Sequence, residues 1–182
     1  MNIIPRLMTR KNLQILWAIA EEEGSLRELG ERIKCSPGKV HQAILIFKRY
    51  GLISVRKEKN RTIIAMNRKS PLYQKIKALV NISRILESRA YLFLKKKAVV
   101  GVYGSYAQGT DEKGSDVDLL VFSEKKEIKL RVAIRMLEGE IGKRVNPFIL
   151  SRERLAKLEK QDKEFAVRLR LTTVMLNGEI FG

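Results

Sequence analysis

The chain has 182 residues, of which 45% are apolar and 31% are charged, a composition typical of a folded protein with a sizeable core. It contains one cysteine, Cys35, which excludes an internal disulfide, and one histidine, His41, which excludes a metal site built from several histidines. No apolar run approaches the roughly 18 residues of a membrane span, and the start of the sequence lacks the apolar segment of a signal peptide. We therefore expect a cytoplasmic protein with no membrane association.

The net charge of +17 is distributed unevenly along the chain. Residues 1–70 hold 15 basic and 6 acidic residues, residues 71–98 hold 7 and 1, and residues 99–182 hold 15 and 13. The basic excess on the first half favours a polyanionic partner for that part, and double-stranded DNA is such a partner. The alternative is a basic surface that interacts only with solvent.

The first 35 residues predict two helices. Residues 9–23 place apolar side chains at helical spacing, and Gly24 ends the pattern. Ser25 follows, with Glu28 three residues later, which is the pattern of a capping box at the start of a helix. A second helix is therefore expected directly after Ser25.

A third helix and a hairpin complete this half of the sequence. Ser36 followed by Pro37 is typical of a helix N-terminus, and Gly51 marks the end of that helix. Residues 52–57 and 61–66 are rich in strand-forming residues and are separated by a polar turn. We expect them to pair as a basic β-hairpin.

Three helices and a basic hairpin in this order resemble the winged-helix variant of the helix-turn-helix of transcription regulators, over about residues 9–67. The resemblance implies that the third helix enters the major groove of DNA by its N-terminal end, while the hairpin contacts phosphates. The matching positions are Ser36, Lys39, His41 and Gln42 for the groove, and Lys57, Lys59 and Arg61 for the phosphates. Winged helices also dock proteins; here the basic excess favours DNA binding and a role in transcription regulation.

Residues 69–97 are expected to form a connecting helix between a domain at 1–68 and a domain at 98–182. Their apolar stripe alternates steps of four and three residues, and it consists of Leu72, Ile76, Leu79, Ser83, Leu86, Ala90 and Phe93. A stripe of this kind is typical of a dimerisation helix, which would give a homodimer suited to palindromic DNA. Packing of the stripe against the neighbouring domain of the same chain is the alternative, and both remain open.

The stretch GSYAQGTDEKGSDVDLL, residues 104–120, contains the candidate chemistry. A buried strand ends at Gly104, and Gly104 and Ser105 begin a short helix whose free amides would suit an anion. Asp116 and Asp118 are two residues apart on the next expected strand, so their side chains share a face. Adjacent carboxylates repel each other unless a cation lies between them, which predicts a site for Mg²⁺ or Mn²⁺ and substrate phosphates.

The whole string, G-S-x-A-x-G, five residues and then S-D-x-D before an apolar run, resembles the signature of the DNA polymerase β nucleotidyltransferase superfamily, in its minimal nucleotidyltransferase branch. The resemblance implies an α+β domain with a mixed sheet and helices. It further implies that Gly104 and Ser105 hold the phosphates of a nucleoside triphosphate such as ATP, and that Asp116 and Asp118 are the catalytic, metal-binding residues. The acceptor in that branch includes partner proteins, whereas other branches modify small molecules or RNA ends.

One position departs from the family's pattern. The family's third carboxylate lies on the strand after the next helix, where this sequence has RVNPFIL, with Asn146 as the corresponding residue. An amide cannot accept the proton of an acceptor hydroxyl. Either a distant carboxylate substitutes, with Asp111, Glu140 and Glu153 as candidates, or the domain does not catalyse efficiently.

The sequence therefore leaves two functions open. One is a DNA-binding enzyme that transfers a nucleoside monophosphate to a protein or other acceptor. The other is a non-catalytic transcription regulator or antitoxin-like protein, whose second domain binds only a nucleotide or a partner. Asp116 and Asp118 favour the first function, and Asn146 favours the second. An enzyme that modifies RNA ends is less favoured, because the tyrosines are scattered and provide no stacking platform.

Overall fold

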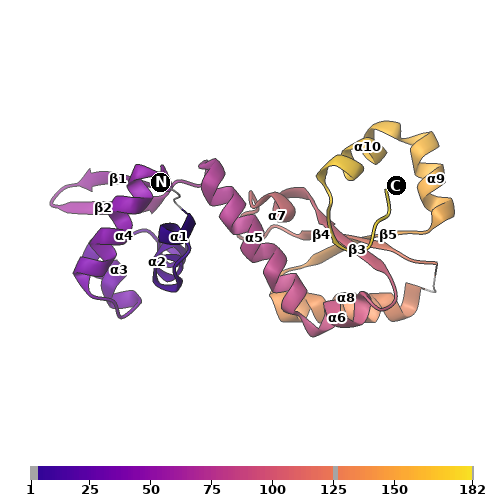
Figure 1. Cartoon of the computed structure of the whole chain (residues 1–182), viewed down its shortest axis with the longest axis horizontal. Helices are drawn as coiled ribbons and strands as arrows, with labels where there is room; N and C mark the ends of the chain where they lie inside the picture. Colours follow the sequence, from indigo (N-terminus) through magenta and orange to yellow (C-terminus); the bar gives the residue numbers. More distant parts are fainter. Residues whose placement is uncertain (1–3, 125–126, 182) are drawn as a thin grey trace. The chain divides into compact units, whose positions relative to one another are not determined.

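The computed structural model describes residues 4–124 and 127–181 (Figure 1). Contacts divide the chain into two compact units, Met1–Tyr73 and Gln74–Gly182. Within the described ranges, no helix is both long enough and apolar enough to cross a membrane.

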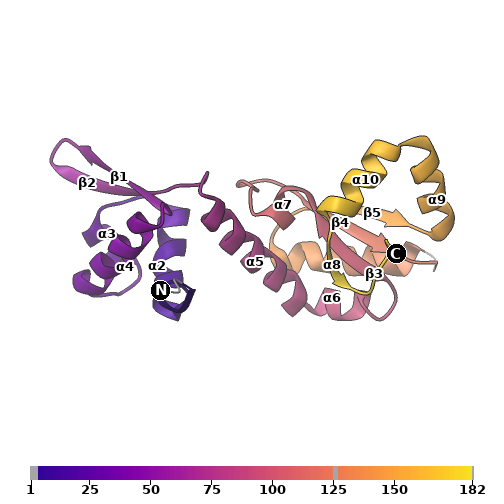
Figure 2. The same ribbon diagram turned by 45° about the horizontal axis from the view of Figure 1, so that its top comes forward.

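The first unit contains the three helices and the hairpin that the sequence predicts. The helices are α2 (Arg10–Glu21), α3 (Leu26–Arg32) and α4 (Pro37–Arg49), preceded by a short α1 (Ile4–Leu7) that the sequence analysis does not anticipate. The strands β1 (Ile53–Glu58) and β2 (Arg61–Met66) pair in antiparallel fashion. Figure 2 shows the hairpin extending from the helices of this unit.

Local hydrogen bonds explain where these helices begin. The Ser25 hydroxyl accepts from the Glu28 backbone N–H, and the Glu28 carboxylate accepts from the Ser25 backbone N–H, so the predicted capping box is present. Ser36 is the N-cap of α4 with Pro37 in its first turn, although the Ser36 side chain makes no capping hydrogen bond. Each side-chain cap satisfies an amide that the helix leaves without a partner.

The core of the first unit joins the helices to the hairpin. Gly24, directly after α2, forms a bridge with Ile64 of β2, and Arg56 of β1 forms an ion pair with Glu23. The largest side chains that are almost fully buried come from every part of the unit: Leu7, Ile15, Leu16, Ile19, Leu29, Phe47, Leu52 and Ile64.

The second unit is built on a four-stranded mixed sheet in the order β5-β4-β3-β6. Its strands are β3 (Val99–Tyr103), β4 (Val117–Phe122), β5 (Val145–Leu150) and β6 (Val174–Asn177). β4 and β5 are parallel, while β3 is antiparallel to both β4 and β6. The mixed α+β character that the sequence predicts is confirmed, whereas β6 is a strand that the sequence analysis missed.

Helices cover both faces of this sheet (Figure 1). One face packs against α6 (Arg89–Leu94) and α8 (Glu127–Ile141) in the larger apolar cluster of the unit. The other face carries a smaller cluster beneath α9 (Arg152–Gln161) and α10 (Lys163–Thr172). A short helix, α7 (Gly104–Gln108), follows β3 directly.

Residues 69–97 differ from the single connecting helix that the sequence analysis expects. The structure contains two helices here, α5 (Pro71–Glu87) and α6, separated at Ser88, whose hydroxyl accepts from the Tyr91 backbone N–H and caps α6. Ile85 and Ala90 are fully buried in the larger apolar cluster of the second unit. This segment therefore belongs largely to the second unit.

The heptad-like stripe is divided by this break. Ala90 is buried within its own unit, as the packing alternative expects, whereas Leu79 and Leu86 are 55% and 39% exposed. The homodimer stays a prediction.

Two helices, α9 and α10, follow β5 and are separated by a single residue. Asp162 lies between α9 and α10, and its carboxylate accepts from the Phe165 backbone N–H. This cap starts α10 at Lys163, two residues after the last residue of α9, so the helical run is interrupted at Asp162.

Candidate functional site

Strand pairing brings the residues of the 104–120 motif together at one end of the sheet. Asp118 is the partner of Tyr103 across the β3–β4 ladder and of Asn146 across the β4–β5 ladder. Gly104 follows Tyr103, and Asp116 immediately precedes β4. Asp118 therefore lies between the Gly-Ser motif on one side and Asn146 on the other.

Gly104 fits closely against Asp118. Its φ angle is +70°, and a Cβ atom added at Gly104 would lie 2.3 Å from Oδ2 of Asp118. Only glycine combines this backbone conformation with this close approach. The position of the Asp118 carboxylate therefore depends on the absence of a side chain at residue 104.

Asn146 contacts Asp118 directly. Its amide Nδ2 donates a hydrogen bond of 3.2 Å to Oδ1 of Asp118. The structure thus places Asn146 where the sequence comparison expects the third acidic residue. Asp116 and Asn146 are exposed and Asp118 is half-buried, so the group is open to solvent on one side.

Tyr103 is a residue of this site that the sequence analysis missed. Burial, and then the negative charge of Asp118, raise the pKa of the Tyr103 phenol. The phenol therefore stays neutral at physiological pH beside Asp118. The antiparallel pairing of β3 with β4 brings these residues together, and no local pattern around Tyr103 indicates it.

The three distant carboxylates lie on different elements of the second unit. Glu140 accepts from the backbone N–H of Ala90, and Asp111 is buried in ion pairs with Lys77 and Lys143. Glu153 is in the first turn of α9, which follows the end of β5 opposite to Asn146.

The described residues hold no group of three or more acidic, histidine or cysteine side chains suited to a metal ion. Asp111 and Glu140 are engaged by other groups of the fold, and substitution by a distant carboxylate stays a prediction.

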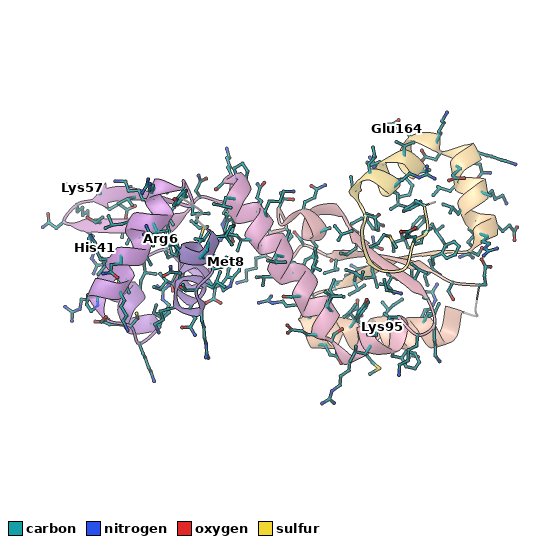
Figure 3. The ribbon with its side chains drawn as sticks, viewed as in Figure 1. Arg6, Met8, His41, Lys57, Lys95 and Glu164 are labelled. Atoms are coloured by element: carbon teal, nitrogen blue, oxygen red, sulfur yellow. The ribbon has the colours of Figure 1, made fainter. Side chains whose placement is uncertain are left out.

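The predicted DNA-contacting residues of α4 are all exposed. Ser36, Lys39, His41 and Gln42 lie in the cap and first turns of this helix. Their neighbour Val40 is fully buried, because it faces the core of the unit. Figure 3 labels His41 on this helix.

The three hairpin residues predicted to contact phosphates differ in whether an ion pair with another part of the unit is present. Lys57 and Lys59 are exposed, and Lys59 lies in the turn with a φ angle of +50°. Arg61 forms a 3.2 Å ion pair with Glu28 of α3. Lys57, labelled in Figure 3, and Lys59 are therefore better placed than Arg61 to bind an anion from outside the chain.

Residues 79–175 match the model of the family described as "Nucleotidyltransferase domain". The chain belongs to the nucleotidyltransferase domain family. The matched region of this nucleotidyltransferase domain includes Gly104, Asp116, Asp118 and Asn146, and it begins within α5 rather than at residue 98.

The other comparisons add little. None of the curated proteins matches the sequence. Among solved structures, reduced HlyU from Vibrio cholerae N16961 matches with 23% identity over 48% of this chain and 87% of that chain. Its TM-score of 0.37 is too low to establish a shared fold.

Proposed function

We propose that the nucleotidyltransferase domain binds a nucleoside triphosphate, with ATP as the first candidate, together with Mg²⁺ or Mn²⁺, and transfers the nucleoside monophosphate to a protein or other acceptor. The observation that supports this proposal best is the juxtaposition of Gly104, Asp118 and Asn146 on three adjacent segments of the sheet end. Asp116 adds a second carboxylate from the residue before β4.

The residues of the site fit a divalent cation. Asp116 and Asp118 offer hard carboxylate oxygens, which are the ligands that Mg²⁺ prefers, and Asp116 is exposed. When bound, the cation would neutralise the charge of the triphosphate and of the departing pyrophosphate. Asp116 and Asp118 would hold it, while the backbone amides at Gly104 and Ser105 would bind phosphate oxygens.

The reaction forms a bond between an acceptor oxygen and the α-phosphorus, and it breaks the bond from that phosphorus to the pyrophosphate oxygen. The proton of the acceptor hydroxyl must leave as well. Asn146 cannot take this proton, because its amide has no basic atom. A proton that passes to solvent or to a group of the acceptor would permit transfer at a reduced rate.

A second function is favoured by the contact between Asn146 and Asp118. The Asn146 amide satisfies Oδ1 of Asp118 without adding a negative charge. A site with two carboxylates would bind a nucleotide with its cation and catalyse poorly. In this case the chain is a regulator or antitoxin-like protein in which nucleotide or a protein partner acts as a signal.

For the first unit we propose a winged helix that binds double-stranded DNA and directs or regulates the nucleotidyltransferase domain. The supporting observations are the exposed N-terminal turns of α4 and the exposed Lys57 and Lys59 on the hairpin. The net charge of +9 on residues 1–70 would attract a polyanion. A homodimer would match the symmetry of palindromic DNA.

The test of transfer uses ATP labelled at the α-phosphate, Mg²⁺ or Mn²⁺, and an extract of the native cell. Wild type, Asp118→Ala and Asn146→Asp are compared. Label on a discrete acceptor that disappears in Asp118→Ala would support transfer by the natural site. Label with Asn146→Asp alone would support the regulatory function, since transfer would then require a carboxylate that the natural site lacks.

A further inference from the structure

The loop between α7 and β4 contains a buried carboxylate that the proposed reaction does not use. This loop, residues 109–115, ends at the residue before Asp116. Its Asp111 is only 5% exposed, although the neighbouring residues Glu112, Lys113 and Gly114 are exposed. A carboxylate leaves water only at a high free-energy cost unless cations and hydrogen-bond donors surround it.

Donors from two other elements meet the Asp111 carboxylate. Oδ1 accepts a 2.8 Å hydrogen bond from Nδ2 of Asn81 and lies 3.1 Å from Nζ of Lys77, both on α5. Oδ2 lies 3.4 Å from Nζ of Lys143, in the segment between α8 and β5. Lys77 also donates to the backbone carbonyl of Asp111. Both carboxylate oxygens are therefore occupied.

The same donors hold the rest of the loop. Lys143 Nζ donates to the backbone carbonyls of Glu112 and Ser115, each at 3.3 Å. Asn81 Nδ2 also donates to the Tyr106 carbonyl in α7, at 2.9 Å. These contacts extend from α7, which begins at Gly104 and Ser105, to the residue immediately before Asp116.

The first residue of the loop is fixed by close backbone packing. Gly109 has a φ angle of +73°, and a Cβ atom there would lie 2.0 Å from the Gln74 carbonyl oxygen and 2.6 Å from the Ala78 nitrogen. The loop thus begins in direct contact with the backbone of α5. Only glycine permits this approach in this conformation.

We propose that Asp111 is a positioning residue for the metal and nucleotide site, acting through the 109–115 loop on Asp116. This proposal rests on the proposed function of the site. A buried ion pair alone does not show that a fold is stabilised, because apolar residues of similar size in the same place often stabilise the fold equally or more. The network around Asp111 instead connects the Asp111 carboxylate and three backbone carbonyls of this loop to side chains of α5 and of the segment before β5. Groups that orient metal ligands in this way commonly tune metal affinity.

The experiment measures Mn²⁺ and ATP binding by the full chain, with free Mn²⁺ followed by electron paramagnetic resonance. Asp111→Asn removes the charge that both lysines face, and Lys143→Met removes the contacts to two loop carbonyls. We expect each variant to weaken Mn²⁺–ATP binding by about tenfold or more. Leu169→Ala is the control, because Leu169 is buried in the cluster beneath α10 and its truncation destabilises the unit away from the loop.

A second readout does not depend on the metal. Hydrogen exchange of the amides of residues 109–116 should accelerate in Asp111→Asn and Lys143→Met, and stay unchanged in Leu169→Ala. Unaltered exchange in the loop of both variants would overturn the proposal. A loss of Mn²⁺–ATP affinity no greater than that of Leu169→Ala would overturn it as well. Failure of the wild type to bind Mn²⁺–ATP would instead reject the proposed function. Circular dichroism at the assay temperature identifies any variant that fails to fold.

Discussion

Gly104 and Asp118 form the contact on which the candidate site depends most closely. The gap between the Gly104 backbone and the Asp118 carboxylate leaves no room for a methyl group. A side chain at residue 104 would move the carboxylate and would also strain a left-handed backbone.

This contact predicts the effect of Gly104→Ala. We expect the variant to bind Mg²⁺–ATP about tenfold or more weakly, because a displaced ligand side chain lowers metal affinity. Gly142→Ala is the matched control, since Gly142 has a φ angle of +67° but no atom within 4 Å of an added Cβ. Isothermal titration calorimetry on both variants separates displacement of Asp118 from backbone strain. Equal affinities in the two variants would contradict the account.

Asn146 gives a second prediction at this scale. Asn146→Asp would place a carboxylate against Oδ1 of Asp118, where the amide now donates a hydrogen bond. Without a cation the like charges repel, so the melting temperature of the variant should fall in EDTA and recover in Mg²⁺. The wild type should show a smaller difference between the two conditions. A melting temperature of the variant that is independent of Mg²⁺ would mean that no cation binds between these side chains.

Among the helices, the capping box of Ser25 and Glu28 is the clearest local signal for where a helix begins, and it starts α3. The pKa of Glu28 is lowered first by the hydrogen bond that its carboxylate accepts from the backbone N–H of Ser25. The Ser25 side chain and then the positive charges of Arg61 and Arg32 lower this pKa further. The pKa of Glu28 is lower in the folded state than in the unfolded state, where it is about 4.3. The ionised carboxylate therefore stabilises the fold fully above the unfolded-state pKa, and this stabilisation is lost as pH falls through the folded-state pKa.

Urea unfolding of Glu28→Gln tests this contribution. At pH 7 the wild type should be more stable than the variant, and at a pH below the folded pKa of Glu28 the difference should disappear. Glu31→Gln in the same helix is the control, because Glu31 is an exposed carboxylate that forms an ion pair with Arg27 four residues earlier. An advantage of the wild type that persists unchanged in acid would contradict the capping role of the ionised Glu28.

The sequence predicts elements well where the signal is local. The caps at Ser25 and Ser36, the glycine that ends α4 and the strands around the 104–120 motif all follow from neighbouring residues. It predicts less well where a cap interrupts a continuous helical pattern, or where a strand depends on pairing with a distant segment. The break between α5 and α6 at Ser88 and the break at Asp162 depend on caps inside continuous helical patterns, and β6 is a short strand that depends on β3 for pairing.

The residues of the candidate site also separate into those that a local motif predicts and those that depend on distant segments. Gly104, Ser105, Asp116 and Asp118 belong to one short motif, and the strand spacing suffices to place Asn146 beside them. The proximity of Tyr103 to Asp118 and the burial of Asp111 could not be predicted, because each depends on segments distant in the sequence. Arg61 was predicted as a phosphate contact from its position in the hairpin, whereas its ion pair with Glu28 depends on how α3 packs against β2.

At the scale of the whole molecule, the uneven charge predicts how the chain binds DNA. If the exposed Lys57 and Lys59 contact phosphates, affinity for duplex DNA should fall steeply with salt, and replacing both with Gln should reduce the slope of log K against log salt by about two. An equal charge change at Lys11 and Lys34 is the control. Fluorescence anisotropy over a salt series measures the slopes, and identical slopes in the two double variants would remove the hairpin contact from the proposal.

We propose that Asp118 belongs to a site for a nucleoside triphosphate and its divalent cation. Calorimetric titration of ATP into the full chain, with Mg²⁺ and with EDTA, tests this proposal. Asp118→Ala is compared with Glu159→Ala, which removes an exposed carboxylate from α9 of the same unit. We expect saturable, Mg²⁺-dependent binding that Asp118→Ala abolishes and Glu159→Ala retains. Binding of equal affinity in Asp118→Ala and wild type would contradict it.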